Sequence, residues 1–325
     1  MLPKFSSTRP ASLEAALDTL AEGKARIHGG GTALIGCLRD GVFGADLLVS
    51  LSAIDELRGL RTAGDGSLHI GAMTTIAELA ADETVAGRYR GLAEAAASVA
   101  SPQLRNQGTI AGNLCQKPRC WYYRGDFHCL RKGGELCYAV EGENRYHCIF
   151  GGELCYIVHP SDTAPMLAAL NAVCRVSGPG STRSVAVESL HVPPSEDPQR
   201  ETVLEPDEII TEVVIPAPAT GLRSSYRKVR TRAVWDFAIA GVALALAFDG
   251  DNVSSARVFL SGAAPVPWRA KGVEEALTGK ALDDATIAKA AAASIDGAEP
   301  LSGNAYKLDI FRAIVAEQLE AMREK

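Results

Sequence analysis

The feature that most constrains the fold is a cysteine-rich segment near the middle of the chain. Six of the eight cysteines lie between Cys115 and Cys155, and the other two are Cys37 and Cys174. The segment shows neither helical nor strand periodicity over most of residues 115–157. A loop of this length inside a compact domain is usually functional or cross-linked. Because local groups of cysteines typically bind metal or form disulfides, one of these is expected to hold the segment together.

The rest of the composition is that of an ordinary globular protein. The chain has 325 residues, of which 47% are hydrophobic and 22% charged, so two or three domains are expected. The net charge of -6 disfavours nucleic-acid binding, which needs a basic face. No apolar run approaches the ~20 residues of a membrane span, and the first residues lack the apolar core of a signal peptide. We therefore expect a cytoplasmic protein with reduced thiols, or a periplasmic one if a signal-bearing partner subunit carries it across the membrane.

Two glycine-containing stretches are candidates for a phosphate-binding site. Residues 29–32 (Gly-Gly-Gly-Thr) lie between a strand pattern and a helical pattern, and residues 108–113 (Gly-Thr-Ile-Ala-Gly-Asn) form the second stretch. Glycines let backbone N–H groups turn toward an anion, and a following helix start adds partial positive charge. The alternative is a tight turn that needs a positive φ. Two such loops in one chain favour a dinucleotide held between subdomains.

The remaining sequence alternates helical and strand patterns. Ser12 and Thr75 are expected to cap helices, residues 64–66 to form a hairpin turn, and residues 216–221 to link two domains. Further strands are expected at residues 47–51, 68–72, 172–176, 208–215, 238–248 and 253–260, and helices at residues 89–100, 162–170, 273–277, 283–295 and 307–325. A solvated acidic loop face is expected from Glu188, Glu196, Asp197, Glu201, Glu205, Asp207 and Glu208.

The chemistry of the cysteine segment has more than one solution on the residues alone. Four thiolates suffice for a cubane iron-sulfur cluster. Tetrahedral zinc also accepts four cysteines, although zinc sites usually contain C-x2-4-C pairs, which are absent here. Because soft thiolate ligands suit both, the residues alone leave the choice between an iron-sulfur cluster and zinc open. Cys37 and Cys174 lie in apolar patterns and are expected to be buried structural residues, as is Cys115 at the end of the second glycine stretch.

Taken together, these stretches resemble the FAD-binding subunit of the molybdenum hydroxylases, the family of xanthine dehydrogenase and carbon monoxide dehydrogenase. The resemblance covers essentially the whole chain. It implies an α+β fold in which two α/β subdomains, residues 1–58 and 59–217, form a PCMH-type FAD-binding domain, followed by an α+β C-terminal domain at residues 221–325. The stretches that carry it are residues 29–34 (GGGTAL), 68–72 (LHIGA), 109–114 (TIAGNL), 159–162 (HPSD), 226–230 (YRKVR) and 236–240 (DFAIA).

The resemblance also implies which residues bind FAD. The two glycine stretches would hold the pyrophosphate, with Gly30 leaving room for a phosphate, while Asp162 and Lys228 would lie near the ribityl chain or the flavin ring. His28 departs from the apolar residue that is usual before the glycines. The FAD-binding residues implied are Ile27, His28, Gly29, Gly30, Gly31, Thr32, Ala33, Thr109, Ala111, Gly112, Asn113, Asp162 and Lys228.

The cysteine insert, residues 115–157, narrows the resemblance further. It is similar to the insert of periplasmic aldehyde oxidoreductases and of 4-hydroxybenzoyl-CoA reductase, whose flavin subunits carry a [4Fe-4S] cluster on an inserted loop. The aldehyde-oxidoreductase type is the nearer match. Cys148 is a competing candidate ligand, His128 and His147 are expected not to bind the metal, and the aromatic residues 121–123 are expected to cover it from solvent. The ligands implied are Cys120, Cys129, Cys137 and Cys155, in a C-x8-C-x7-C-x17-C spacing.

The implied function is electron transfer within a heterotrimeric oxidoreductase. A large subunit would hold the molybdenum cofactor, and a small [2Fe-2S] subunit would pass electrons to FAD on this chain, which would hand them to an external acceptor. No catalytic triad or equivalent set appears in this sequence. One alternative is a 4-hydroxybenzoyl-CoA reductase flavin subunit, in which electrons flow inward. The other is a zinc-stapled nucleotide-binding module without redox activity.

Overall fold

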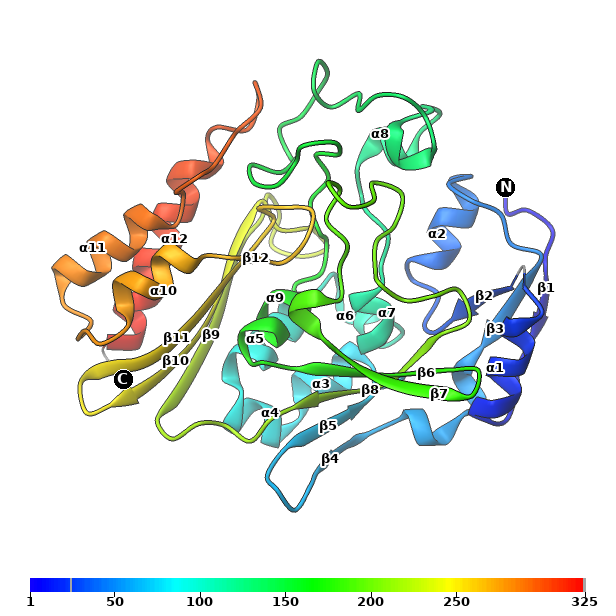
Figure 1. Ribbon diagram of the computed structural model, residues 1–325, viewed down its shortest axis with the longest axis horizontal. Coiled ribbons are helices and arrows are strands. Elements are labelled where there is room, and N and C mark those ends of the chain that lie inside the picture. Colours follow the sequence, from blue (N-terminus) through cyan, green and yellow to red (C-terminus); the bar gives the residue numbers. More distant parts are fainter. Residues whose placement is uncertain (24, 324–325) are drawn as a thin grey trace.

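Three β-sheets organise the protein, and the first is a small parallel sheet. The computed structural model describes residues 1–23 and 25–323, and Figure 1 shows the first sheet at the right, the second at the centre and the third at the left. The first sheet has the strand order β1-β3-β2. Its elements are β1 (Ser6–Thr8), α1 (Leu13–Ala21), β2 (Ala25–His28), α2 (Leu34–Arg39) and β3 (Leu47–Ser50), followed by two short 3-10 turns, η1 (Leu51–Ala53) and η2 (Asp55–Leu57). The expected cap is confirmed, because the Ser12 hydroxyl accepts a hydrogen bond from the Ala15 N–H at 3.2 Å.

The second sheet is antiparallel and carries most of the helices that surround the glycine loops. Its strand order is β4-β5-β8-β6-β7. The expected cap at Thr75 is confirmed as a reciprocal pair: its hydroxyl accepts from the Glu78 N–H, and the Glu78 carboxylate accepts from the Thr75 N–H. The strands are β4 (Leu60–Thr62), β5 (Leu68–Gly71), β6 (Val173–Gly178), β7 (Ser181–Ala186) and β8 (Ile209–Ile215). The helices are α3 (Ile76–Ala81), α4 (Glu83–Arg88), α5 (Arg90–Ser98), α6 (Pro102–Arg105), α7 (Ile110–Leu114) and α9 (Thr163–Ala169), and η4 (Val187–Ser189) follows β7.

The third sheet is antiparallel and is buried on both faces. Successive side chains of a strand point to opposite faces, and Ala243 and Ala245 pack into the core beneath α5 and α9, while Val242 and Leu244 pack under the C-terminal helices. Burial on both faces explains the unbroken apolar run of the central strand. The order is β12-β11-β10-β9, formed by β9 (Leu222–Val229), β10 (Ala240–Asp249), β11 (Asn252–Ser261) and β12 (Trp268–Arg269) and covered by α10 (Lys271–Leu277), α11 (Asp284–Ala293) and α12 (Lys307–Arg323).

The mixed α+β fold predicted from the sequence is confirmed, with several short elements added. The expected helices and strands all appear, with ends shifted by a few residues, and the last two residues of the helix expected at 307–325 lie outside the described residues. The sequence did not predict the edge strands β1, β4 and β7, nor β9, whose polar side chains hide its strand pattern. Among residues 1–23 and 25–323, no helix has the length and apolar character needed to cross a membrane.

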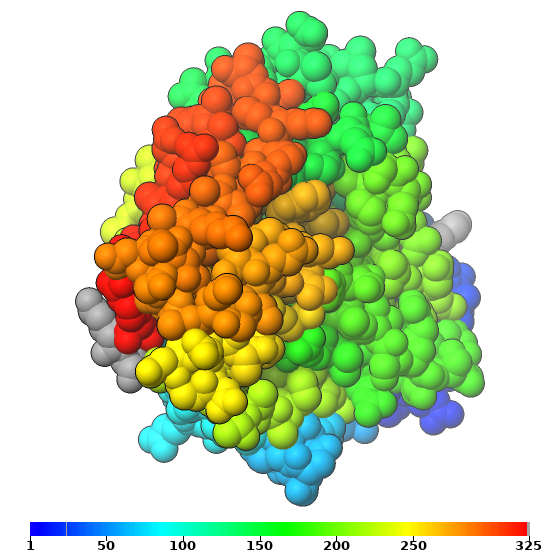
Figure 2. All heavy atoms as spheres, turned by 60° about the vertical axis from the view of Figure 1, so that its left-hand side comes forward, coloured from blue at the N-terminus to red at the C-terminus, as the bar shows by residue number. Residues whose placement is uncertain are grey.

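The cysteine insert is largely irregular, as expected, and is fixed from below by the C-terminal part of the chain. It contains only α8 (Trp121–Arg124) and η3 (Leu130–Lys132). Figure 2 shows it at the top of the molecule, against the segment that leads into α12. The Asn304 amide donates to the carbonyls of His147 and Cys148 at 3.1 and 3.0 Å. The fully buried Lys307 ammonium, whose pKa burial lowers to about 8, donates to the His147 carbonyl at 2.9 Å.

The prediction of a solvated acidic face is wrong for three of its seven residues, Glu188, Glu201 and Glu208, whereas Glu196 and Glu205 are exposed as predicted. Glu201 accepts from Lys117 and from the buried Arg131, and so ties the start of the insert to the second sheet. Glu188 bridges two arginines at the contact between the second and third sheets, and Glu208 pairs with Arg183 at 2.7 Å. The prediction failed for these residues because the sequence shows their charge but not the arginine and lysine side chains that the fold brings next to them.

Candidate functional site

The two glycine stretches lie against each other, backbone to backbone. A Cβ on Gly30 would stand 1.7 Å from the Gln107 carbonyl oxygen and 2.5 Å from its carbon, and a Cβ on Gly29 would stand 3.0 Å from the Thr109 hydroxyl. The space beside Gly30 is therefore filled by the second loop. The prediction that Gly30 is needed to leave room for a phosphate is wrong in its reason, since glycine is required there for the close approach of the two loops.

The first loop also contains the tight turn that the sequence left as an alternative. Gly31 has a φ of +74°, and a Cβ there would stand 2.7 Å from Nε2 of His28. The loop leads into α2, whose N-cap residue Ala33 has no side chain that can accept from the first helical N–H groups. At α7 the Thr109 hydroxyl accepts from the Gly112 N–H at 3.2 Å, whereas at α2 no side chain caps the helix and the Gly31 carbonyl accepts from the Ile35 N–H at 3.0 Å.

Two cavities meet at these loops and lead away in different directions. The first, of about 360 Å³, reaches Asp162, Lys228 and Trp235, while the second, of about 290 Å³, reaches Leu51 and Ile209. Thr32, Ala33, Thr109 and Gly112 line both. An elongated ligand could therefore cross the loops with one arm in each cavity. Of the thirteen predicted FAD-binding residues, all but His28 line a cavity: the first takes Asn113, Asp162 and Lys228, and the second takes Ile27, Gly29, Gly30, Gly31 and Ala111.

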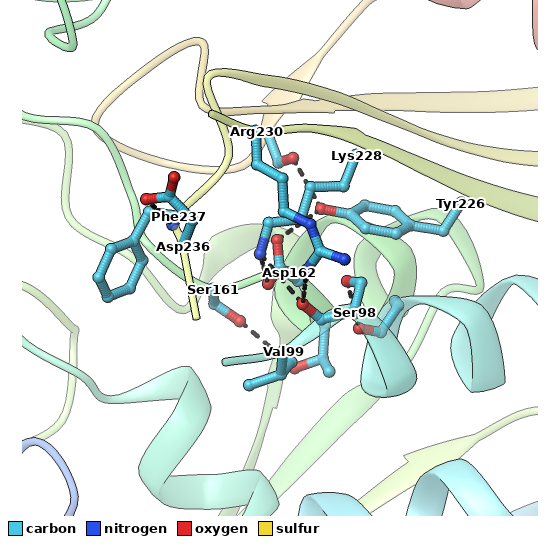
Figure 3. A network of polar contacts seen from close by, with 12 residues as sticks. Ser98, Val99, Ser161, Asp162, Tyr226, Lys228, Arg230, Asp236 and Phe237 are labelled. Carbon is cyan, nitrogen blue, oxygen red and sulfur yellow. Dashed lines mark hydrogen bonds and ion pairs between the residues drawn. The ribbon is translucent and has the colours of Figure 1, made fainter. Parts of the chain in front are cut away.

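Asp162 is the centre of a buried polar network at the far end of the first cavity. The Lys228 ammonium lies 2.7 Å from its carboxylate, and both side chains are at most 5% exposed. Tyr226 donates to the same carboxylate at 2.8 Å and accepts from Ser261 at 2.9 Å. Figure 3 shows Lys228 and Tyr226 of β9 converging on Asp162, which precedes α9. Burial raises the pKa of Asp162, and the charge of Lys228 opposes that rise.

Lys228 and Arg230 also fix the backbone after α5. The carbonyl of Ser98 accepts from Lys228 at 3.2 Å and from Arg230 at 3.1 Å, as Figure 3 illustrates. Two residues beyond, Ala100 has a φ of +42° and its carbonyl accepts from the N–H of Trp235, whose φ is +55°. Positive φ at residues other than glycine is uncommon and strained. Both strained residues line the first cavity, to which the loop between β9 and β10 contributes Trp235.

Asn113 joins the second glycine stretch to the same network. Its side-chain oxygen accepts from the hydroxyls of Ser161 and Thr163, the latter at 2.8 Å. Ser161 in turn accepts from the N–H of Ala164 in the first turn of α9. These contacts fix α7 against α9, so Asn113 and Asp162 reach the cavity in a set orientation.

Three arginines that the sequence did not single out also line the first cavity. Arg39 is largely exposed, whereas Arg124 pairs with Asp40 at 3.4 Å and donates through its other nitrogens to the carbonyls of Pro118 and Lys117. Arg119 stacks on the ring of Phe237 at 5.1 Å. Burial lowers the pKa of Arg119 to about 10, and the nearby Arg124 charge adds to the effect. Arg119 and Arg124 belong to a group of basic residues at the start of the insert, whereas Arg39 lies at the end of α2 and carried no comparable signal.

The four predicted metal ligands line one cavity inside the insert. Cys120, Cys129, Cys137 and Cys155 surround it together with Tyr122, Tyr123, Arg131, Tyr138 and His147. The free space is about 10 Å³, so the side chains would have to move apart to accept a cluster. In the part of the chain that the structure describes, no three His, Cys, Asp or Glu side chains are grouped to hold a single metal ion. In residue type, four cysteines that line one cavity match the donor set of a thiolate-ligated iron-sulfur group, and the insert around them contains no strand that a change in its shape would break.

The other cysteines and histidines lie outside this cavity or at its edge. Cys148 is buried but does not line it, and Cys37 and Cys174 are fully buried in the cores, as predicted. His147 is buried with Nε2 at 3.3 Å from the Cys120 sulfur, and burial lowers its pKa to about 4, which keeps the ring neutral. Burial also raises the pKa of the Cys120 thiol to about 12. Metal binding would therefore have to displace that proton.

Aromatic rings pack around the outside of the cysteine cavity. Tyr122 lies 5.1 Å from the ring of Phe127 and 6.0 Å from that of Tyr138, and Trp121 lies 5.6 Å from His147, all as centroid distances. His128 is exposed and is not among the residues that line the cavity. The predicted role of residues 121–123 in covering the site thus agrees with where their rings lie.

Comparison with known proteins accounts for both halves of the chain. Residues 3–218 match the family described as the FAD binding domain in molybdopterin dehydrogenase, and residues 224–321 match the CO dehydrogenase flavoprotein C-terminal domain. The chain belongs to the FAD-binding subunits of the molybdenum hydroxylases. As such a subunit it is part of an oxidoreductase complex, and the two cavities that meet at the glycine loops are lined mostly by its FAD-binding domain, with Lys228 and Trp235 of the C-terminal domain added in the first.

Relatives of this FAD-binding subunit match over nearly its full length. It is 36% identical to the aldehyde oxidoreductase FAD-binding subunit PaoB of Escherichia coli (strain K12), with 95% of each chain covered. It is 29% identical to the carbon monoxide dehydrogenase medium chain of Hydrogenophaga pseudoflava, covering 98% of this chain and 97% of the other. Among solved structures, a chain of quinoline 2-oxidoreductase from Pseudomonas putida 86 superposes with a TM-score of 0.78 at 25% identity, over 100% of this chain and 98% of the other.

Proposed function

We propose that this chain is the electron-transfer subunit of an aldehyde-oxidoreductase-type complex and that it holds a [4Fe-4S] cluster in its cysteine insert beside the FAD. Electrons would arrive from a [2Fe-2S] group on the small subunit and leave through the FAD to an external acceptor. FAD exchanges electrons in pairs or singly, and an iron-sulfur cluster exchanges them singly. The 36% identity to an aldehyde oxidoreductase FAD-binding subunit favours the aldehyde class over other substrates.

The observation that carries the cluster proposal is a shared wall between two cavities. Cys120 and Tyr122 line the cysteine cavity, while the adjacent Arg119 and Arg124 line the cavity that contains Asp162. Residues 119–124, which include α8, therefore separate the two sites by the thickness of one short segment. A thiolate cluster in the insert would lie next to the flavin site, which is the arrangement that electron exchange between them requires.

In this function, residues of the chain would orient the FAD and set the charge around it. The backbone N–H groups of Gly31 and Thr32 and the Thr32 hydroxyl would contact the diphosphate. Asp162 and Lys228, neutralising each other, would offer an acceptor and a donor to the ribityl chain or the ring edge. Trp235 and its loop would limit the access of water to the flavin.

The test is the iron and flavin content of the purified complex and of single-cysteine variants. Cys120→Ser and Cys155→Ser should each lose the iron of the insert, seen as a fall in iron per FAD and loss of the [4Fe-4S] spectroscopic signal. Cys174→Ser is the control, because this cysteine is buried like Cys155 but lies on β6, away from the cavity. Cys148→Ser tests the competing ligand. Equal iron in Cys120→Ser and in the control would remove the ligand assignment.

Two alternatives have distinct outcomes in the same material. A zinc-stapled module would be free of iron and colourless, with zinc retained after dialysis. A subunit of the 4-hydroxybenzoyl-CoA reductase type would contain the same cofactors but would be reduced by a low-potential donor and not by an aldehyde. The spacing of the four cysteines, which lacks the C-x2-4-C pairs usual in zinc sites, favours a cluster over zinc.

A further inference from the structure

The first cavity contains one guanidinium whose hydrogen bonding is incomplete. Within residues 1–23 and 25–323, Arg119 contributes the only buried guanidinium nitrogen without a partner, its Nε. Its one hydrogen bond is a long contact of 3.4 Å from Nη2 to the side-chain oxygen of Gln116. The other face of the group rests on the ring of Phe237. Buried polar groups are rarely left unpaired, and a buried charge without a counter-ion is still less favourable.

The neighbouring arginines show that this deficit is specific to Arg119. Arg124 uses Nε, Nη1 and Nη2 on the Pro118 carbonyl, the Asp40 carboxylate and the Lys117 carbonyl. Arg39 lies 3.6 Å from the same Asp40 and its side chain is 68% exposed, so water can satisfy it. Asp40 is thus already shared by two arginines, and none of the carboxylates in the described residues forms an ion pair with Arg119. The cavity therefore has an excess of positive charge at this point.

The direction in which Arg119 faces identifies the side from which an anion would come. The Arg119 side chain lines the cavity that also contains Thr32, Asp162 and Lys228, whereas Cys120, the next residue, lines the cysteine cavity. The missing partner is therefore expected among ligands of the flavin cavity. The group that suits a planar guanidinium is an oxygen anion, which it can contact with two N–H groups at once.

We propose that Arg119 pairs with a negatively charged group of the bound flavin nucleotide and completes there the hydrogen bonding that its own chain does not supply. This inference rests on the proposed function, since it requires FAD in this cavity. Two groups of the nucleotide carry suitable charge, the diphosphate in every redox state and the ring system once it is reduced. Both are anionic partners for the same guanidinium. Loss of the contact would change the affinity for FAD in the first case and the midpoint potential of the flavin in the second.

The experiment compares Arg119→Gln, Arg119→Lys and Arg39→Gln in the assembled complex. FAD affinity is measured by titrating the deflavinated complex with FAD and following flavin fluorescence, and the flavin midpoint potential by anaerobic spectroelectrochemistry. If Arg119 contacts the diphosphate, Arg119→Gln should bind FAD about 10- to 100-fold more weakly, as expected for a lost hydrogen bond to a charged group, with an unchanged potential. If it contacts the reduced ring, the affinity for oxidised FAD should be unchanged and the midpoint potential should fall by about 30–60 mV. This shift is the same 10- to 100-fold factor, about 30 mV for each factor of ten, expressed as a potential for a two-electron couple.

Matched controls separate direct pairing from a general effect of charge. Arg39→Gln removes a charge from the same cavity but from an exposed side chain, so both quantities should stay close to the wild-type values. Arg119→Lys keeps the charge without the planar fork and should recover part of the loss. The proposal is overturned if Arg119→Gln matches the wild type in both measurements, or if Arg39→Gln shows the same change. A wild-type complex that binds no FAD would instead refute the proposed function.

Discussion

Replacing Gly30 with alanine tests whether close contact between the two glycine stretches is what makes the FAD site. The added Cβ would stand 1.7 Å from the carbonyl oxygen of Gln107, whereas ordinary contacts begin near 3.4 Å. The atoms in the way are backbone atoms, so no side-chain rotation can relieve the clash. The two loops must therefore move apart by roughly 1.7 Å, the difference between the two distances.

The size of the effect follows from where the strain is relieved. Forcing extra atoms into a packed site costs about 1–3 kcal/mol, and contact with backbone places this substitution near 3 kcal/mol. Without FAD the loops can separate and relieve the strain, so most of the cost should appear when the ligand draws them together. A loss of about 3 kcal/mol corresponds to FAD binding that is about 100-fold weaker.

The assay is FAD titration of the deflavinated complex, together with thermal unfolding with and without FAD. Gly87→Ala is the matched control, because Gly87 lies within α4 and a Cβ there meets nothing within 4 Å. It should leave FAD affinity unchanged and raise stability by roughly 1 kcal/mol through better helix propensity. If Gly30→Ala binds FAD as tightly as the wild type and unfolds at the same temperature, the two loops do not meet as described.

Two further predictions concern buried charges. Burial lowers the pKa of His191 to about 4, below its unfolded value, so stability is complete above pH 6.5 and falls as the pH drops toward 4. Between pH 7.5 and 5, the free energy of unfolding measured in urea should fall by about 2 kcal/mol less in His191→Gln than in the wild type. Parallel curves of unfolding free energy against pH would contradict this. Lys228→Met leaves Asp162 buried without its cation and should cost about 3–5 kcal/mol at pH 7.5. Because burial raises the pKa of that carboxyl, the loss should shrink at pH 5 as it is protonated, and adding Asp162→Asn should restore stability; a deficit equal at both pH values would refute the argument.

The sequence predicted the elements whose signal is local. Ser12 and Thr75 cap helices as expected because a cap needs only a hydroxyl followed by a helical pattern. The strand β10 was also predicted from its long apolar run, since a strand covered on both faces needs no alternation of apolar and polar residues. The edge strand β7 was missed because its exposed side chains carry almost no apolar signal.

The candidate site was predictable only where its residues carry a motif. The glycine stretches were named from their residues and the four cysteines from the resemblance, and the cysteines do line one cavity. Arg119 and Trp235 were not named, because they reach the first cavity only through the way in which the insert and the loop between β9 and β10 pack against it. The same limit explains the error over Glu201, whose partners Lys117 and Arg131 lie some 70 to 84 residues away in the sequence.

The way the insert is fixed bears on how its two sites communicate. Arg131 and Lys307 anchor it by buried charges to the second sheet and to the C-terminal helix, so its outer frame cannot move freely. Cys120 precedes both anchored segments and lines the cysteine cavity, while its neighbour Arg119 faces the flavin cavity. If the insert holds the proposed cluster, a bond from Cys120 to it would fix the position of the adjacent guanidinium on the flavin side. By linkage, flavin binding would then favour binding of the cluster.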